Sequence, residues 1–421
     1  MTEKIYKNIL WFGMAAIIVF SPIGKGAARI WSITPILLVS YALIFIWLWR
    51  INNRDCFVVP PAAGLLAMTG RKGAAIDAMT RIRGAAIDIP IFLFGALAIT
   101  STFFSIYKHD SFYELLKLFC YAGLYYLIVN EFDRDMVRRL LYIVIMTGAV
   151  LSAYGILQYL NLCDHSWWDP EGFMAATFVN HNHFSGYLEL AIPAAVIFVL
   201  KKHALAFRLL IVSALMIMVA AFVLAQSRGA WIGLSVSLLA MVFIVLRKRN
   251  NSMRSVIFLT LLAAAVISLA YFGKDIISER IGPSAASSGA EDASFTTRLK
   301  IWQGSIDMIR HNFIFGTGIG TFAWGFPKYR PEGLNVMANF AHNDYLQIAC
   351  ETGILGLVIA LWLFVVVIKT GLSKGNLRSY RLGCSIGVLS LSLHALSDFN
   401  FHIPANMLLF TIYLAIIMEE R

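Results

Sequence analysis

Two apolar runs separated by a short polar junction, FRLLIVSALMIMVAAFVLAQSRGAWIGLSVSLLAMVFIVL, occupy residues 207–246 of the chain. A helix of roughly 18–20 apolar residues crosses the hydrocarbon core of a bilayer. The runs 207–225 and 230–246 are therefore predicted to be two membrane spans joined by a tight turn. Arg228 lies in that turn, next to a glycine that would let another group approach.

The composition extends this prediction to the whole chain of 421 residues. Apolar residues make up 59% and charged residues 14% of the sequence, and its mean hydropathy is +0.72. Soluble domains average about 45–50% apolar and about 25% charged residues. This composition excludes a soluble, disordered, coiled-coil or nucleic-acid-binding protein as the main interpretation. We expect an all-α fold, a polytopic membrane helix bundle that forms one domain over residues 1–421.

Twelve apolar segments are candidate transmembrane helices. They are 5–20, 31–49, 89–106, 112–129, 137–160, 184–200, 207–225, 230–246, 255–272, 345–368, 382–396 and 405–418. No small-residue cleavage site follows the first segment, so we expect an uncleaved anchor rather than a signal peptide. An even number of spans places both termini on one side, and most loop Lys and Arg residues fall on that side. The positive-inside rule predicts that it is cytoplasmic.

The long loops carry the remaining sequence information. Two outer loops, 161–183 and 273–343, are long enough to hold function, whereas the role of the inner stretch 50–88 is not readable. In the second outer loop, apolar residues recur at helical spacing and predict an amphipathic helix on the outer membrane face or against the bundle. These residues are Leu299, Trp302, Ile306, Ile309 and Phe313.

Ionisable residues in or beside the spans are costly and therefore mark candidate sites. Glu189 and Glu351 lie in the outer halves of their spans, and Asp398 lies just outside a span. This pattern favours an outward-facing site over a transmembrane proton or ion path. Arg298 is expected in the first turn of the loop helix, where a cation opposes the helix dipole unless an anion binds there.

His342 opens the sharpest polar cluster, Ala341-His342-Asn343-Asp344-Tyr345, at the start of a span. Asn343 or Asp344 can cap that helix and so fix His342 at the membrane surface. Histidine is suited to accept a proton near neutral pH. A lone loop histidine can equally be structural, so residue type and spacing leave both interpretations open.

Two further polar clusters are expected on the outer side. One contains His181 and His183, and the other contains His394, Asp398 and His402. No H-x3-H pair on a predicted helix accompanies them, and the five cysteines are dispersed. The sequence therefore predicts neither a catalytic metal nor a disulfide framework.

Together, these motifs resemble bacterial O-antigen ligase and O-antigen polymerase-like membrane glycosyltransferases, and also O-linked oligosaccharyltransferases. His342-Asn343, nine residues and Gly353-Ile354-Leu355-Gly356 match the H-N-x9-G-x-x-G pattern of ligases and oligosaccharyltransferases. Two other segments resemble arginine-bearing motifs of the family: Gln226 to Trp231, and Thr297-Arg298-Leu299 with the downstream GTGIGTF. The resemblance is strongest over 227–404.

The resemblance implies transfer of a glycan from a polyprenyl (undecaprenyl) diphosphate to an acceptor hydroxyl at the periplasmic face of the bacterial inner membrane. Arg228 and Arg298 would bind the diphosphate and His342 would act as the base. No cofactor or metal is implied. The donor glycan, a glycan or lipid A–core acceptor and membrane lipid are the expected partners. Further candidates for substrate contact are Asn343, Asp344, Glu189, Glu351, Asp398, His181 and His183.

Other functions stay open at this point. Ligase and polymerase differ in acceptor rather than in donor chemistry, and the sequence does not separate them. Some proteins sharing this domain have been associated with bicarbonate accumulation, so the alternative is a bicarbonate-type transporter or a non-catalytic subunit of a polysaccharide assembly complex. A transporter would predict broken helices and polar groups near the midplane.

Overall fold

The computed structural model describes residues 2–54, 86–162, 173–201, 203–247, 295–373 and 379–419. Within these ranges the chain is helical and contains no strand. A helix coincides with every predicted span except 255–272, which lies outside the described residues. Part of the outer loop 273–343 also lies outside them, and the predicted domain limits stay predictions.

The helices of the bundle form because each is apolar over most of its length. They are α1 (Glu3–Ile23), α2 (Ile30–Arg54), α4 (Asp88–Phe103), α5 (Lys108–Glu131), α6 (Arg134–Tyr159), α7 (His181–Leu200), α8 (Leu205–Leu224), α9 (Arg228–Arg247), α14 (Asp344–Ser373), α15 (Tyr380–His394) and α16 (Pro404–Met418). Among the described residues, α1, α2, α5, α6, α7, α8 and α14 are long and apolar enough to cross a membrane. The all-helical membrane fold is confirmed, whereas the count of twelve spans is not.

Helix α7 forms the centre of the bundle. Its side chains are buried from His181 to Val199, because α6, α8, α9, α15 and α16 pack around it. Neighbouring helices, rather than lipid, therefore enclose α7 on all sides. The polar residues at its first turn are therefore buried together with the rest of the helix.

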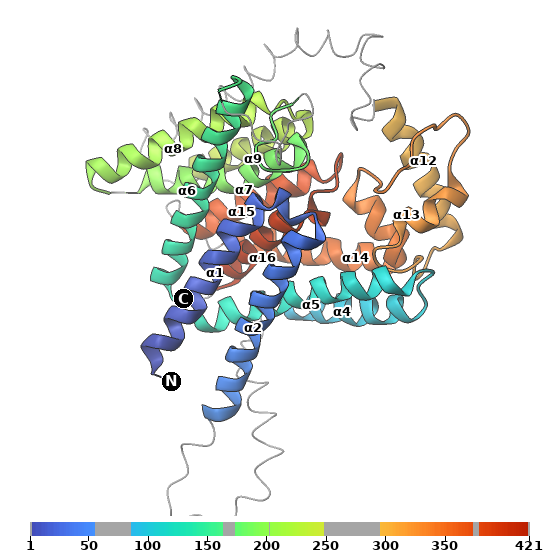
Figure 1. Cartoon of the computed structure of the whole chain (residues 1–421), viewed down its shortest axis with the longest axis horizontal. Coiled ribbons are helices and arrows are strands. Elements are labelled where there is room, and N and C mark those ends of the chain that lie inside the picture. Colours follow the sequence, from blue (N-terminus) through green and yellow to red (C-terminus); the bar gives the residue numbers. More distant parts are fainter. Residues whose placement is uncertain are drawn as a thin grey trace, which may run out of the picture.

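The two ends of the bundle differ in their contacts. At one end, Lys7 forms an ion pair with Glu131 at 3.2 Å and Arg50 pairs with Glu3. Figure 1 shows the two termini close together at this end. The opposite end collects the first turns of α7, α9 and α14 and the last turn of α15, and the candidate site lies there.

A small helical layer covers part of that second end. It consists of α12 (Phe295–His311), α13 (Phe322–Gly325) and a 3-10 turn, Phe326–Tyr329 (Figure 1). Helix α12 is confirmed, but its packing face is formed by Ile301, Ser305 and Met308 rather than by the predicted apolar stripe. Leu299, Ile306 and Phe313 of that stripe are exposed, whereas Ile309 packs against the same buried cluster, so only part of the predicted stripe faces the bundle.

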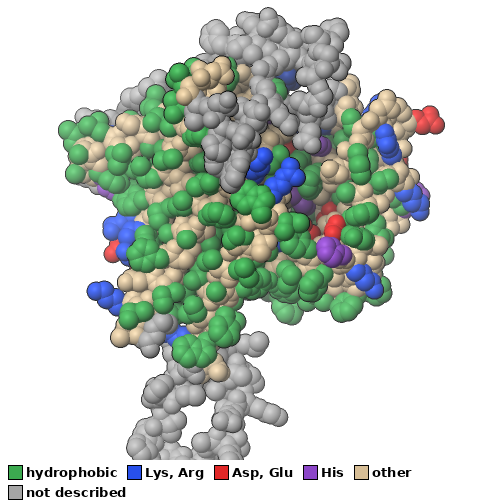
Figure 2. All heavy atoms as spheres, in the orientation of Figure 1, with side chains coloured by type: hydrophobic (Ala, Val, Ile, Leu, Met, Phe, Trp, Pro, Cys, Tyr) green, Lys and Arg blue, Asp and Glu red, His purple; other side chains and the backbone are tan. Residues whose placement is uncertain are grey.

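The surface is divided in the same way. Figure 2 shows hydrophobic side chains over most of the bundle face, whereas charged and histidine side chains gather beside a hollow next to the α12 layer. An apolar surface of this extent on the bundle is expected for a protein solvated by lipid.

Helix α14 is broken at Gly353, where φ is +69° and ψ is −173°. The backbone of residues 313–318 runs alongside the break: Ile354 N donates to Phe313 O, and Gly318 N donates to Glu351 O. A Cβ atom at Gly353 would lie 2.1 Å from Ile314 O. The first glycine of the H-N-x9-G-x-x-G pattern is therefore required by backbone conformation and by close approach.

Replacing Gly353 should destabilise the fold. Its backbone region is nearly exclusive to glycine and costs about 1–3 kcal/mol for other residues, and displacement of the 313–318 backbone adds to this. Gly353→Ala should lower the free energy of unfolding by at least about 2 kcal/mol, measured as a lower melting temperature in detergent. Gly95→Ala is the control, because no atom lies within 4 Å of a Cβ at Gly95. Equal melting temperatures for the two variants would contradict this account.

Candidate active site

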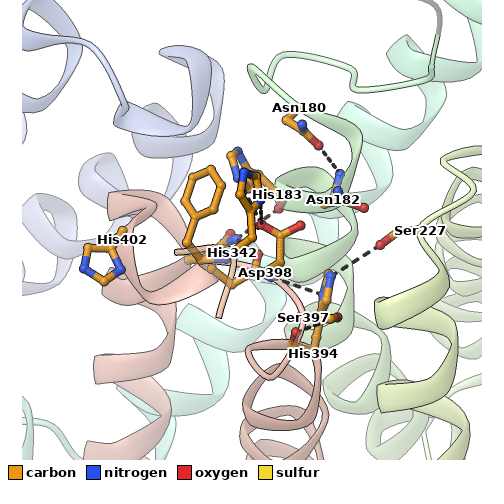
Figure 3. Close-up of polar contacts among 12 residues, drawn as sticks. Asn180, Asn182, His183, Ser227, His342, His394, Ser397, Asp398 and His402 are labelled. Carbon is orange, nitrogen blue, oxygen red and sulfur yellow. Dashed lines mark hydrogen bonds and ion pairs between the residues drawn. The ribbon is translucent and has the colours of Figure 1, made fainter. Parts of the chain in front are cut away.

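A buried carboxylate, that of Asp398, lies at the centre of the site. Asp398 follows α15 and is 2% exposed. Its Oδ1 lies 3.9 Å from His183 Nε2 and 4.0 Å from His342 Nδ1, and its Oδ2 lies 4.0 Å from Arg298 Nη2. Figure 3 shows the rings of His183 and His342 directed toward this carboxylate. Residues far apart in the sequence are thus brought together around one negative charge.

His342 is held in a constrained backbone conformation. Its φ is +49°, a left-handed value that is uncommon for residues other than glycine. Ala341 before it donates its N–H to Gln347 Oε1 at 3.0 Å and accepts from Trp302 Nε1 at 3.1 Å. Asn343 after it caps α14 by accepting from Tyr345 N at 3.0 Å. These contacts fix the direction in which the imidazole leaves the backbone.

Asn343 and Asp344 tie the start of α14 to the loop that contains Asp398. The bond from Tyr345 N confirms that Asn343 caps the helix. The Asn343 side chain also donates to Leu396 O at 2.9 Å and so contacts the neighbouring loop. Asp344 is fully buried and accepts from Phe401 N at 2.9 Å. Its Oδ1 lies 2.7 Å from His402 Nδ1. The hydrogen bonds of Asn343 and Asp344 thus hold the first turn of α14 against the loop that contains Asp398.

Arg298 approaches Asp398 from the first turn of α12. Its Nη1 donates to Ser397 O at 2.7 Å, and its side chain is 18% exposed. Its Nε atom is buried without a hydrogen-bond partner in the described part of the chain. The guanidinium therefore retains donor capacity for an anion after it has bound the loop.

Arg228, the first residue of α9, borders the same loop. Gly229 packs so closely that a Cβ atom there would lie 2.5 Å from Ser397 Oγ. Ser227 lies 3.4 Å from His394 Nε2. The side chain of Arg228 is exposed and has no ion pair with another described residue. Arg298 thus binds Ser397 directly, and Arg228 lies next to Gly229, which packs against Ser397. Nothing in the sequence pattern indicated Ser397.

His181 and His183, two residues apart on α7, have different surroundings. Asn180 caps the helix by accepting from Asn182 N at 2.7 Å. The ring of His183 faces Asp398, whereas the ring of His181 stacks on Phe173 with a centroid separation of 4.3 Å. The structure therefore brings His183, rather than His181, to the central carboxylate.

Glu189 lies below the site inside the bundle. It is fully buried, with Oε2 2.7 Å from His394 Nδ1 and Oε1 accepting from Ser390 at 2.6 Å. A buried carboxylate with these partners is satisfied by the protein. Its contacts hold α7 against α15 at the level of Ser227.

Glu351 is also removed from Asp398. Its carboxylate accepts from Gly320 N at 2.7 Å, from Phe322 N at 3.3 Å and from Gln347 Nε2 at 3.1 Å. The glycine-rich segment 316–320 could form an anion-binding nest of backbone amides. In this chain the amides of Gly320 and Phe322 donate to the protein's own Glu351, which links this segment to α14.

Metal coordination was not predicted for these polar clusters. Among the described residues, no group of three or more His, Cys, Asp or Glu side chains could hold a metal ion. Metal-independent chemistry stays a prediction.

Comparison with known proteins adds an independent observation. Residues 211–361 match a family model described as O-antigen ligase. The matched segment contains Arg228, Arg298 and His342, whereas His183 and Asp398 lie outside it. A comparison with curated proteins found no match. The resemblance expected from the motifs is confirmed over this segment, and it supports glycosyl transfer of the ligase or polymerase type in general.

The Asp344–His402 pair leads to a pH-dependent prediction. Burial lowers the pKa of His402, but the hydrogen bond and charge of Asp344 outweigh burial and raise it. The folded-state pKa therefore exceeds the unfolded value of about 6.5. The pair should stabilise the fold fully below about pH 6.5 and lose its contribution as pH rises through the folded-state pKa.

The melting temperature of His402→Gln should consequently lie furthest below that of the wild type at about pH 6 and approach it as pH rises through the raised folded-state pKa of His402. Melting followed by intrinsic fluorescence in detergent tests this, with the exposed His311→Gln as control. A gap that widens with pH would show that the pair is not stabilised by a protonated imidazole.

Proposed function

We propose that this protein transfers a glycan from a polyprenyl diphosphate donor to an acceptor hydroxyl, with Arg228 and Arg298 on the diphosphate and His342 as the base. The observation that carries the proposal is the convergence of His342 and Arg298 on Asp398, beside the exposed Arg228, at one end of an apolar helix bundle. The match of residues 211–361 to O-antigen ligases supports the same reaction class.

The donor would bind at the arginines. A polyprenyl tail lies in the bilayer, so its diphosphate lies at the level where the helices end. As the bond between the anomeric carbon and the diphosphate breaks, negative charge develops on the leaving oxygen. Fixed guanidinium groups stabilise that charge without reorganising. Arg298 is fixed by Ser397 and has an unpartnered Nε, so it is suited to this role.

The acceptor would react at His342. Its imidazole takes the proton of the acceptor hydroxyl as the oxygen attacks the anomeric carbon, and polyprenyl diphosphate leaves from the opposite face. This single displacement inverts the anomeric configuration. Asp398 would orient His342 and stabilise the imidazolium ion that forms, as carboxylates do in hydrolase triads.

Asp398 has the charge that this role needs. Burial by itself raises the pKa of its carboxyl group, but the neighbouring His183 and the charge of Arg298 outweigh burial, and the pKa lies below the usual value. The carboxylate is therefore ionised at neutral pH. Its distance of 4.0 Å from His342 Nδ1 is longer than a hydrogen bond, so we expect the pair to tighten when substrate binds.

We place the site at the periplasmic face of the bacterial inner membrane, with both termini cytoplasmic. The loop cations and the grouping of the terminal contacts Lys7–Glu131 and Glu3–Arg50 at the other end of the bundle support this orientation. The break in α14 gives little support to transport, because backbone from residues 313–318 fills it.

Substitution of the three residues tests the chemistry. In proteoliposomes with lipid-linked glycan, His342→Ala should lower the rate of transfer by about 10²–10⁴-fold, since it removes the base. Arg228→Ala and Arg298→Ala should each lower it by about 10²–10³-fold. Arg310→Ala is the matched control, because Arg310 lies on α12 but is exposed and paired with Asp307 at 3.0 Å. The mechanism is wrong if all three variants, correctly inserted, keep full transfer.

Deletion of the gene would separate ligase from polymerase. A ligase predicts loss of all long polymer from the lipopolysaccharide while lipid-linked polymer accumulates. A polymerase predicts that single repeat units stay attached.

A further inference from the structure

His183 has a buried nitrogen atom to which no described residue forms a hydrogen bond. The residue is 4% exposed, and its Nε2 has no hydrogen-bond partner within the described chain. Leaving a buried polar atom unpaired costs about 1–3 kcal/mol, so such atoms call for a specific explanation. Nε2 points toward Asp398 Oδ1 across 3.9 Å, a distance too long for a direct hydrogen bond.

The rest of His183 is firmly held. Its carbonyl accepts from Asn406 Nδ2 at 3.0 Å, and Asn406 in turn donates to Asn400 at 3.0 Å. Its ring meets Phe399 edge-on, with centroids 4.7 Å apart. None of these contacts uses Nε2. The fold therefore orients the imidazole while leaving the nitrogen that faces Asp398 available.

His342 shares this environment. It contacts the same ring of Phe399, with centroids 5.0 Å apart, and approaches the same oxygen of Asp398. Phe399 is itself stacked on Phe340 at 4.2 Å. One aromatic side chain thus holds two imidazoles beside one carboxylate oxygen, as Figure 3 shows for His183, His342 and Asp398.

The two oxygens of Asp398 face different partners. Oδ2 faces Arg298 at 4.0 Å, and Oδ1 faces the imidazoles of His183 and His342. If Arg298 binds the donor diphosphate, the Oδ1 side is left for the acceptor. An anion is disfavoured there because the carboxylate borders the same space. A neutral hydroxyl is favoured, because it can donate to Oδ1 and accept from an imidazole N–H.

We propose that His183 is an acceptor-binding residue whose Nε2 hydrogen-bonds a sugar hydroxyl in the space it shares with His342 and Asp398. The inference rests on the proposed glycosyl transfer and assigns the acceptor a subsite. His342 takes the proton of the reacting hydroxyl, and His183 orients that hydroxyl or its neighbour. His183 lies outside the segment 211–361 that matches the O-antigen ligase model, so this subsite draws on a helix beyond that segment.

Substitutions at position 183 test the subsite. Reconstituted protein is supplied with undecaprenyl diphosphate-linked glycan as donor and lipid A–core lipopolysaccharide as acceptor. His183→Leu, which removes Nε2, should raise KM for the acceptor about 10–100-fold. Its kcat and its KM for the donor should stay within about threefold of the wild type. His183→Gln, which restores a polar group near Nε2, should recover most of the acceptor affinity.

Tyr187→Phe is the matched control. Tyr187 lies one turn further along α7, is buried, and has a hydroxyl without a hydrogen-bond partner among the described residues. This variant should keep wild-type kinetics. Binding of lipid A–core lipopolysaccharide without donor, measured by calorimetry, should weaken by the same factor in His183→Leu and give a readout independent of turnover.

Two results overturn the assignment. If the wild type transfers glycan and His183→Leu keeps its acceptor KM, the subsite is wrong while the proposed function stands. If His183→Leu and His183→Gln lose melting temperature and activity equally, His183 is a packing residue. A wild-type protein that transfers no glycan to any hydroxyl would instead overturn the proposed function, and the inference with it.

Discussion

The site depends on one buried negative charge, that of Asp398. A carboxylate withdrawn from water is costly unless opposite charge or hydrogen-bond donors surround it. Here the compensation comes from Arg298, His183 and His342, which three separate segments supply. Each partner stands about 4 Å away, so the charge attracts them without closing the space between. None of the three closes a direct hydrogen bond to the carboxylate at these distances.

Second-layer contacts keep the partners of Asp398 in position. Asp344 joins α14 to the loop after α15 through His402, and Glu189 joins α7 to α15 through His394. Glu351 fastens the glycine-rich segment of the outer loop to α14. Helix packing in a membrane gains little from the hydrophobic effect, so such polar contacts specify how the ends of the helices are arranged. These buried polar contacts fix the helix ends that carry the partners of Asp398.

The two carboxylate oxygens of Asp398 face different partners, and this arrangement fits the proposed glycosyl transfer. A displacement at an anomeric carbon needs cations on the leaving diphosphate and a base on the incoming hydroxyl, on opposite faces of the sugar. The guanidinium of Arg298 lies toward one carboxylate oxygen, and two imidazoles lie toward the other. A single carboxylate can then serve both halves of the reaction. In the proposed reaction, it would attract the arginine that binds the donor and polarise the imidazole that activates the acceptor.

Composition and periodicity determined the membrane bundle, because apolar runs long enough to cross a bilayer can hardly form anything else. The motifs around Arg228, Arg298 and His342, and a helix cap at Asn343 or Asp344, could also be predicted, since each depends on neighbours within a few residues. The roles of Glu189 and Glu351 could not be predicted. In the sequence both are costly carboxylates within spans, but in the structure each binds groups of the protein itself. The choice of His183 over His181 and the central position of Asp398 came only from tertiary packing. They depend on which helix ends meet, and contacts between residues 56 to 215 positions apart leave no local pattern in the sequence.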